Sequence, residues 1–141
     1  MTRRLADPWC GLLVLVLIAS GEVFAQKTLR ISESGLRGAA INVVMPVYPK
    51  ESLKNKTAGV AVAQLQVTER GIVADVSVIE APGEFAAKAV SEAVRQWVFQ
   101  PIFVHGERVK VIAKLTFYFV ADKNGGRVEN PRTFVRRKRS S

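Results

Sequence analysis

The side chains best suited to chemistry are few and far apart in this chain. His105 is the single histidine and stands before a glycine, as is typical of a turn, and Cys10 is the single cysteine. The carboxylates of Glu69, Asp75 and Glu80 are spread along a predicted hairpin and form no pair suited to acid–base catalysis. We find no set of metal ligands, no glycine-rich phosphate loop and no nucleophile with a base. The sequence therefore predicts neither an enzyme nor a cofactor.

The first 25 residues have the three parts of a secretory signal peptide. Basic residues near the start precede an apolar run over 12–19, and Val-Phe-Ala at 23–25 provides a cleavage site. The uncharged stretch spans only 8–21, which is shorter than the about 20 apolar residues that cross a bilayer. We therefore predict export, with an uncleaved inner-membrane anchor as the less favoured alternative.

The chain is strongly basic, with 21 Lys and Arg residues, 12 Asp and Glu residues and a formal net charge of +9. The predicted signal peptide contains two charges of each sign, so its removal leaves this value unchanged. Such a surface attracts nucleic acid, anionic lipid or an acidic protein segment. Export argues against nucleic acid, so membrane headgroups, cell-wall polymers and an acidic peptide segment remain as possible classes of partner.

Composition divides the exported part of the chain into three regions. Residues 26–42 follow no regular period and are predicted to be a linker, whereas residues 43–121 carry regular hydrophobic patterns. Residues 122–141 end in Arg-Arg-Lys-Arg-Ser-Ser and are predicted to be a flexible basic tail. This tail is either a solvated end or an electrostatic tether to an anionic membrane surface.

The central region predicts two helices and three strands. A short helix over 50–55 follows a proline, and alternating residues over 60–67 and 72–79 indicate an antiparallel hairpin. Apolar residues at three- and four-residue spacing indicate a long helix over 84–96. Alternation over 108–120 indicates the last strand.

The apolar stripe of the long helix needs an apolar sheet face to cover. This stripe consists of Phe85, Ala86, Ala89, Val90, Ala93, Val94 and Trp97. We therefore predict an α+β fold of two layers, in which one long helix covers a three-stranded antiparallel sheet and a short helix precedes the first strand. The core is expected to contain the aromatic residues Trp97, Phe99, Phe117 and Phe119.

The last strand is expected to pair beside the first one and so to form an edge of the sheet. The backbone N–H and C=O groups over 108–120 would then be unpaired on one side, which suits the addition of an extended partner segment. Lys110 and Lys114 would either select an acidic segment or only discourage unwanted pairing. The predicted contact residues on this strand are Lys110, Ile112, Lys114, Thr116 and Tyr118.

Several motifs in this region, taken in order, resemble the C-terminal domain of TonB, the energy transducer of Gram-negative bacteria. The resemblance covers about residues 43–120. The matching residues are Pro46, Tyr48, Pro49, Gly59, Gly71, Ala93-Val94-Arg95-Gln96-Trp97, Phe99, Pro101 and Gly106, followed by the aromatic end of the last strand.

The resemblance implies a periplasmic domain that grips a short segment of an outer-membrane receptor, the TonB box, by strand addition. In that family, force from a proton-driven motor in the inner membrane then opens the receptor for transport. The position before Pro46 is often Gln in that family and is thought to contact the receptor segment, whereas this chain has Met45. We therefore expect further partner contacts at Met45, Pro46, Tyr48 and Pro49.

Besides Met45, a second departure from the family pattern keeps an alternative open. Full transducers carry a spanning anchor and a long proline-rich linker, whereas residues 26–42 contain no proline. Fully extended at about 3.5 Å per residue, they reach at most about 60 Å. The alternative is an envelope adaptor or dimerisation module of the same fold, acting as a homodimer without force transduction.

Overall fold

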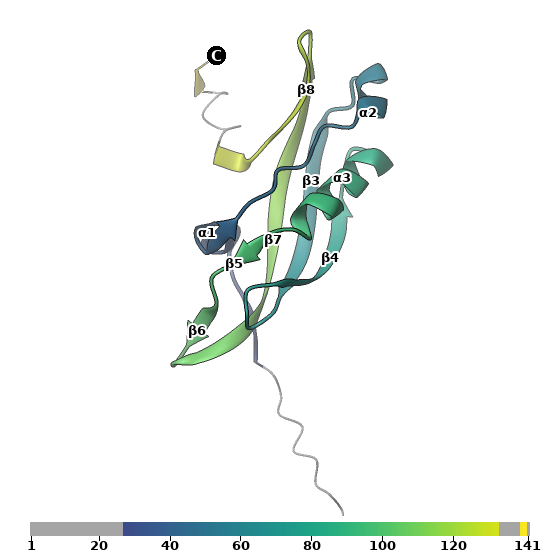
Figure 1. Ribbon diagram of the computed structural model, residues 1–141. Helices are drawn as coiled ribbons and strands as arrows, with labels where there is room; N and C mark the ends of the chain where they lie inside the picture. The colour runs from purple at the N-terminus through teal and green to yellow at the C-terminus, as the bar shows by residue number, and fades with distance from the viewer. Residues whose placement is uncertain (1–26, 133–138, 141) are drawn as a thin grey trace, which may run out of the picture.

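The computed structural model describes residues 27–132, 139 and 140, and Figure 1 shows their arrangement. The predicted signal peptide and most of the basic run near the C-terminus lie outside these residues. Within the described ranges, no helix combines the length and apolarity that a membrane span requires.

Three antiparallel strands form the centre of the sheet. They are β3 (Gly59–Val67), β4 (Val73–Glu80) and β7 (Glu107–Asp122). β3 pairs with β4 through the predicted hairpin and with β7 on its other side. Gly71 closes the hairpin turn with φ of 83°, and a Cβ there would meet the carbonyl oxygen of Phe99 at 1.8 Å. Glycine is therefore required at this position.

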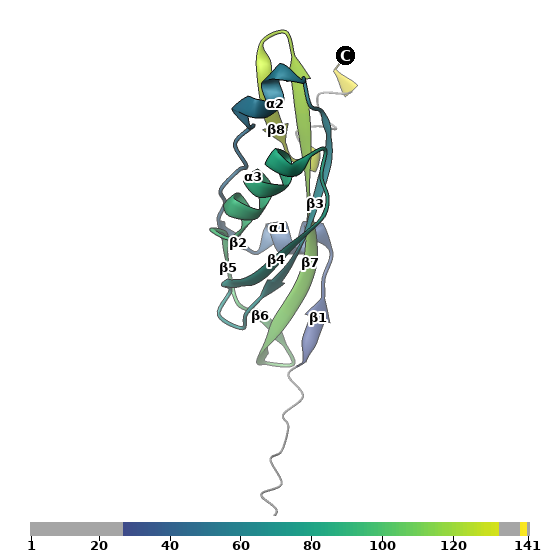
Figure 2. The ribbon, with the colours of Figure 1, turned by 90° about the vertical axis from the view of Figure 1, so that its right-hand side faces the viewer.

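Two of the helices occupy their predicted places. The short helix α2 (Lys50–Lys54) precedes β3, and the long helix α3 (Glu84–Val94) packs across one face of the sheet, as Figure 2 shows. Ala86, Val90 and Val94 on α3 are buried against the strands. The α+β class is therefore confirmed.

The predicted count of three strands is wrong. The main sheet has six strands in the order β1–β7–β3–β4, with two more strands also paired to β7, and a separate sheet has two strands. Each additional strand has two to five residues, too few for a period of two to be recognised in the sequence. They are β1 (Thr28–Arg30), β2 (Ala40–Asn42), β5 (Val98–Phe99), β6 (Ile102–Val104) and β8 (Gly125–Glu129).

The region predicted to be a linker is folded where the structure describes it. It contains β1, the helix α1 (Glu33–Gly38) and β2. Leu36 on α1 is fully buried and belongs to the same hydrophobic core as β3 and β7. The linker prediction for 26–42 is therefore wrong, because one apolar residue in a short helix produces no periodic signal.

The start of the predicted tail is also folded. β8 pairs antiparallel with the end of β7, so the prediction of a flexible tail from residue 122 is wrong over 125–129. Gly126 lies against the ring of Tyr48, and a Cβ at Gly126 would approach that ring to 2.2 Å. This close contact explains why the strand passes with a glycine at that point.

The core lies between α3 and the sheet. The four predicted core aromatics, Trp97, Phe99, Phe117 and Phe119, are all at most 2% exposed. The indole of Trp97 meets the ring of Phe117 edge-on, with centroids 6.2 Å apart, and its Nε1–H donates to the Val44 carbonyl at 2.7 Å. Phe85 is the exception in the predicted stripe: it is 53% exposed in the first turn of α3, where it faces a groove.

We predict that Trp97→Ala destabilises the fold by about 3–5 kcal/mol, because the substitution leaves a cavity under α3. Phe85→Ala serves as the control, since this aromatic residue on the same helix is largely exposed and its loss should have a small effect. Chemical denaturation of both variants measures the difference. Equal stability of Trp97→Ala and the unmodified chain would show that the packing of α3 on the sheet is misassigned.

Candidate partner-binding edge

The five predicted contact residues of the last strand share one face of β7. They alternate with Val111, Ala113, Leu115 and Phe117, which are buried in the hydrophobic core. Lys114 is exposed, and the other four are partly exposed. The predicted contact side chains therefore point away from the helical layer.

The edge of β7, however, is not free as predicted. In the order of the sheet β7 lies inside, between β1 and β3, while β4 forms the outer strand on the other side. β1 pairs in parallel with residues 110–112, and the Ile31 N–H donates to the Ile112 carbonyl at 3.1 Å. β8 covers residues 118–122. A period of two shows which side chains are buried but not which segments pair with a strand, so the sequence did not reveal these neighbours.

Helix α1 satisfies the same edge at Thr116 with two side chains. Glu33 Oε1 accepts the Thr116 N–H at 2.9 Å, and Glu33 Oε2 accepts the Thr116 hydroxyl at 2.9 Å. The Arg37 guanidinium donates to the Thr116 carbonyl at 2.8 Å. Glu33 and Arg37 therefore replace the acceptor and the donor that a neighbouring strand would supply.

The same two residues bind each other and the core. Arg37 forms an ion pair with Glu33 at 2.8 Å, one turn apart on α1. Its guanidinium also lies 5.4 Å from the ring centre of Phe117 and 5.7 Å from that of Trp97, within the range of a cation–π interaction. Sequence reasoning missed both residues. The spacing of Glu33 and Arg37 was visible, but their contact with a residue about 80 positions away was not.

Lys114 marks the gap between these covering segments. Backbone groups alternate sides along a strand, so its N–H and C=O point to the same side as those of Ile112 and Thr116. Among the described residues, no strand and no side chain pairs with them on that side. A cavity of about 290 Å³ lies there, lined by Arg30, Ile31, Glu33, Gln64, Ile112, Ala113 and Lys114. The edge thus has an opening about one residue long.

The four predicted contact residues before α2 lie on a different surface. Tyr48 packs on Phe119, on the buried face of β7, with ring centres 5.9 Å apart, whereas Lys114 is on the opposite face. Pro46 and Tyr48 are buried, and Met45 and Pro49 are partly exposed. The structure therefore separates the predicted site into two surfaces.

Tyr48 has a structural role in this arrangement. Its hydroxyl donates to the Thr57 carbonyl, and burial raises the pKa of this phenol above its usual value. The ring also supports Gly126 of β8. Tyr48 therefore joins the segment before α2 to the end of the sheet at which β3 begins and β8 pairs with β7, and it offers little surface to a partner.

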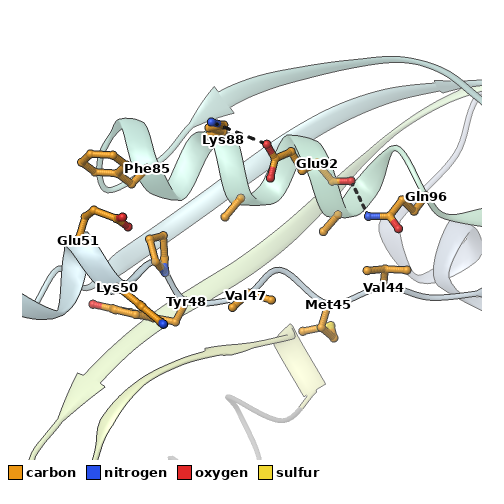
Figure 3. Close-up of a pocket in the computed structure, with 13 residues that line it drawn as sticks. Val44, Met45, Val47, Tyr48, Lys50, Glu51, Phe85, Lys88, Glu92 and Gln96 are labelled. Carbon is orange, nitrogen blue, oxygen red and sulfur yellow. Dashed lines mark hydrogen bonds and ion pairs between the residues drawn. The ribbon is translucent and has the colours of Figure 1, made fainter.

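A groove of about 500 Å³ runs between residues 44–51 and α3, as Figure 3 shows. Val47 is 80% exposed at its rim, and Phe85 contributes from the helix. On α3, Lys88 lies 4.0 Å from Glu92 in an exposed ion pair. Val47 was not predicted, although a residue between the buried Pro46 and Tyr48 is expected to point outward.

An ionic cluster holds β8 to β7. Arg127 pairs with Asp122 and with Glu129, the latter at 2.7 Å. The hydrogen bond from Arg127, followed by that from the Asn124 N–H, lowers the pKa of Asp122. Because the folded-state pKa lies below the usual one, this contribution to stability is present at neutral pH and is lost as the pH falls through the lowered value. The far end of the β7 edge is closed by the pairing with β8, and the ionic cluster adds to the attachment of that strand at neutral pH.

The described residues contain no group of three His, Cys, Asp or Glu side chains that could hold a metal ion. A helix packed on one face of a sheet is a two-layer α+β architecture. The chain belongs to the family of Gram-negative bacterial TonB protein C-terminal domains, whose model matches residues 44–121.

A solved structure supports the fold. The chain is similar to the solution NMR structure of the Pseudomonas aeruginosa TonB C-terminal domain, with a TM-score of 0.52 and 24% identity. The match covers 70% of this chain and 97% of that one. No curated protein matches the chain. β1, α1 and β8, which border the outer side of β7, all lie outside the range that the family model matches.

We predict that Glu33→Ala selectively exposes the Thr116 amide, because it removes both side-chain acceptors at this residue. A buried donor left without a partner costs about 1–3 kcal/mol. Hydrogen exchange should therefore accelerate at the Thr116 N–H. Glu51→Ala, at an exposed acidic position in the first turn of α2, is the matched control. Unchanged exchange at Thr116 in Glu33→Ala would contradict this role of α1.

Proposed function

We propose that this chain is a periplasmic TonB-type domain that binds an extended segment of an outer-membrane receptor or a similar envelope protein. The segment pairs with the outer edge of β7 at Lys114, the position that β1 and α1 leave uncovered, and this contact is linked to energy-coupled transport. The observation that carries the proposal is the backbone of Lys114, whose N–H and C=O point to the outer side of β7 and pair with no described strand there, beside a cavity that Lys114 lines.

The chemistry of this edge favours strand addition. A partner strand placed there would receive one donor and one acceptor from Lys114 and would continue the ladder of the sheet. Lys110 and Lys114 flank Ile112 on the outer face, so acidic side chains on the segment would be attracted. We therefore expect an acidic segment, bound more weakly as salt increases.

The groove beside α3 provides a second, separate surface for the same partner. Met45 and Pro49 contribute exposed atoms there, while the buried Pro46 and Tyr48 anchor residues 44–51 of this chain to the core. The exposed Val47 adds apolar area to the rim. Side chains of the receptor segment, or of residues next to it in the receptor, would contact this groove. The groove would not supply backbone pairing.

The proposed periplasmic location and the remaining proposed partner rest on the predicted signal peptide and on the basic run near the C-terminus. An exported chain carrying this domain would meet receptors from the periplasmic side of the outer membrane. The basic run near the C-terminus, most of which lies outside the described residues, would support contact with an anionic membrane surface.

Homodimerisation is the competing function, and the outer side of β4 favours it. Within the described ranges no strand pairs with that side, so a second copy would meet exposed backbone there. Asp75 and Glu80 and the register irregularities along β3–β4 are features that protect an edge from pairing. We therefore prefer β7 as the binding edge.

Titration of the isotope-labelled chain with a synthetic TonB-box peptide tests the proposal. Amide shifts should concentrate over residues 110–116 and weaken at higher salt. Shifts along 73–80 that depend on protein concentration would instead support the dimer. The absence of any shift at millimolar peptide would overturn the receptor-binding function.

We predict that Lys114→Pro abolishes peptide binding while the fold is kept. Proline lacks the N–H that the partner would use, and this N–H has no partner on that side among the described residues. Lys114→Ala is the matched control, because it removes the same charge and retains the N–H. Calorimetric titration should show a few-fold weaker affinity for the alanine variant and no binding for the proline variant. Equal affinities of the two variants would show that backbone pairing at Lys114 plays no part.

A further inference from the structure

β1, which covers the edge beside Lys114, is a weakly held strand. It has three residues, and all three side chains are exposed, including the apolar Leu29 at 37%. It pairs in parallel with residues 110–112, and parallel pairs are slightly less stable than antiparallel ones. A short, exposed segment of this kind opens locally at a low free-energy cost. β1 can therefore leave β7 without exposing a core side chain of its own.

The charge of β1 suits this position poorly. Arg30, which is paired with Ile112, brings a positive charge to the face of the edge that already carries Lys110 and Lys114. Arg30 and Lys114 line the same cavity. Like charges on neighbouring strands repel, whereas an acidic strand in the same place would be attracted by both lysines. The edge is thus better matched to an acidic segment than to the strand that occupies it.

The chain directly after β1 is, in contrast, firmly attached. The Ser32 hydroxyl accepts the Gly35 N–H at 3.2 Å and caps α1, and Leu36 is fully buried. The Glu33 contacts with Thr116 add a third attachment. Separation of β1 therefore pivots near Ile31 and leaves α1 in place.

We infer that β1 is a built-in competitor for the partner edge, displaced when an acidic extended segment pairs with residues 110–114. This inference rests on the proposed function. The Lys114 opening is the point at which an incoming segment first contacts the backbone, and the pairs over 110–112 then pass from β1 to the partner. The apparent affinity for the partner is therefore the intrinsic affinity of the open edge multiplied by the fraction of molecules in which β1 has left β7.

A reversible disulfide between β1 and β7 tests the competition. Arg30 and Ile112 are paired in register, so Arg30→Cys with Ile112→Cys, in a chain that also carries Cys10→Ser, places two thiols opposite each other. The oxidised protein should lose binding of an acidic TonB-box peptide, and reduction of the same sample should restore it. Binding by the oxidised form at the affinity of the reduced form would overturn the inference and leave the proposed function intact.

A second disulfide on the other side of the sheet provides the control. Gln66 and Asp75 are paired between β3 and β4, and Gln66→Cys with Asp75→Cys should bind the peptide in both redox states. Loss of binding on oxidation of this control as well would attribute the effect to general rigidity and would overturn the competition.

A measurement without peptide keeps the inference testable if the proposed function fails. The Ile31 N–H, which is bonded to the Ile112 carbonyl, should exchange far faster than the amide of Leu65 in the core strand β3. If the Ile31 N–H exchanges only when the whole protein unfolds, β1 does not leave β7, and the inference fails whether or not the peptide binds. If no peptide binds any reduced variant, the receptor-binding function fails on its own.

Discussion

A strand of 16 residues needs hydrogen-bond partners on both of its sides, and in β7 this requirement organises the molecule. One side is satisfied by β3 over residues 111–119. The other side is assembled from pieces: a short parallel strand, two side chains of α1 and a hairpin strand. The core depends on this strand too, because its buried residues share one hydrophobic core with those of α3, and Phe117 meets the ring of Trp97. The N–H and C=O of Lys114 differ from this pattern, because no described segment pairs with them on the outer side of β7.

The sequence predicted the parts whose signals are periodic. Alternation from Val109 to Phe119 correctly assigned the buried face of β7, and the spacing from Ala86 to Trp97 correctly assigned the buried face of α3. Phe85 fits that spacing but is exposed, because it lies in the first turn of the helix beside a groove. Periodicity thus identified the two layers but not the ends of the elements.

The neighbours of β7 could not be predicted in this way. β1 is too short to alternate, and the role of Glu33 depends on Thr116, which is remote in the sequence. The candidate site was affected in the same manner. Met45 and Lys114 were expected to contact one partner, yet they lie on different surfaces, because sequence patterns do not specify which face of the sheet a preceding segment follows. The part of the chain that matches the family model provides β7, and β1, α1 and β8, which lie outside that match, cover its outer side. Both parts therefore shape the proposed binding edge.

Backbone pairing of a partner with β7 beside Lys114 can be observed by isotope-filtered NOE spectroscopy of the labelled chain with an unlabelled TonB-box peptide. We expect contacts from peptide backbone protons to those of Ile112 and Lys114. Contacts found only along 73–80 of β4, or only in the groove lined by residues 44–51, would contradict this pairing.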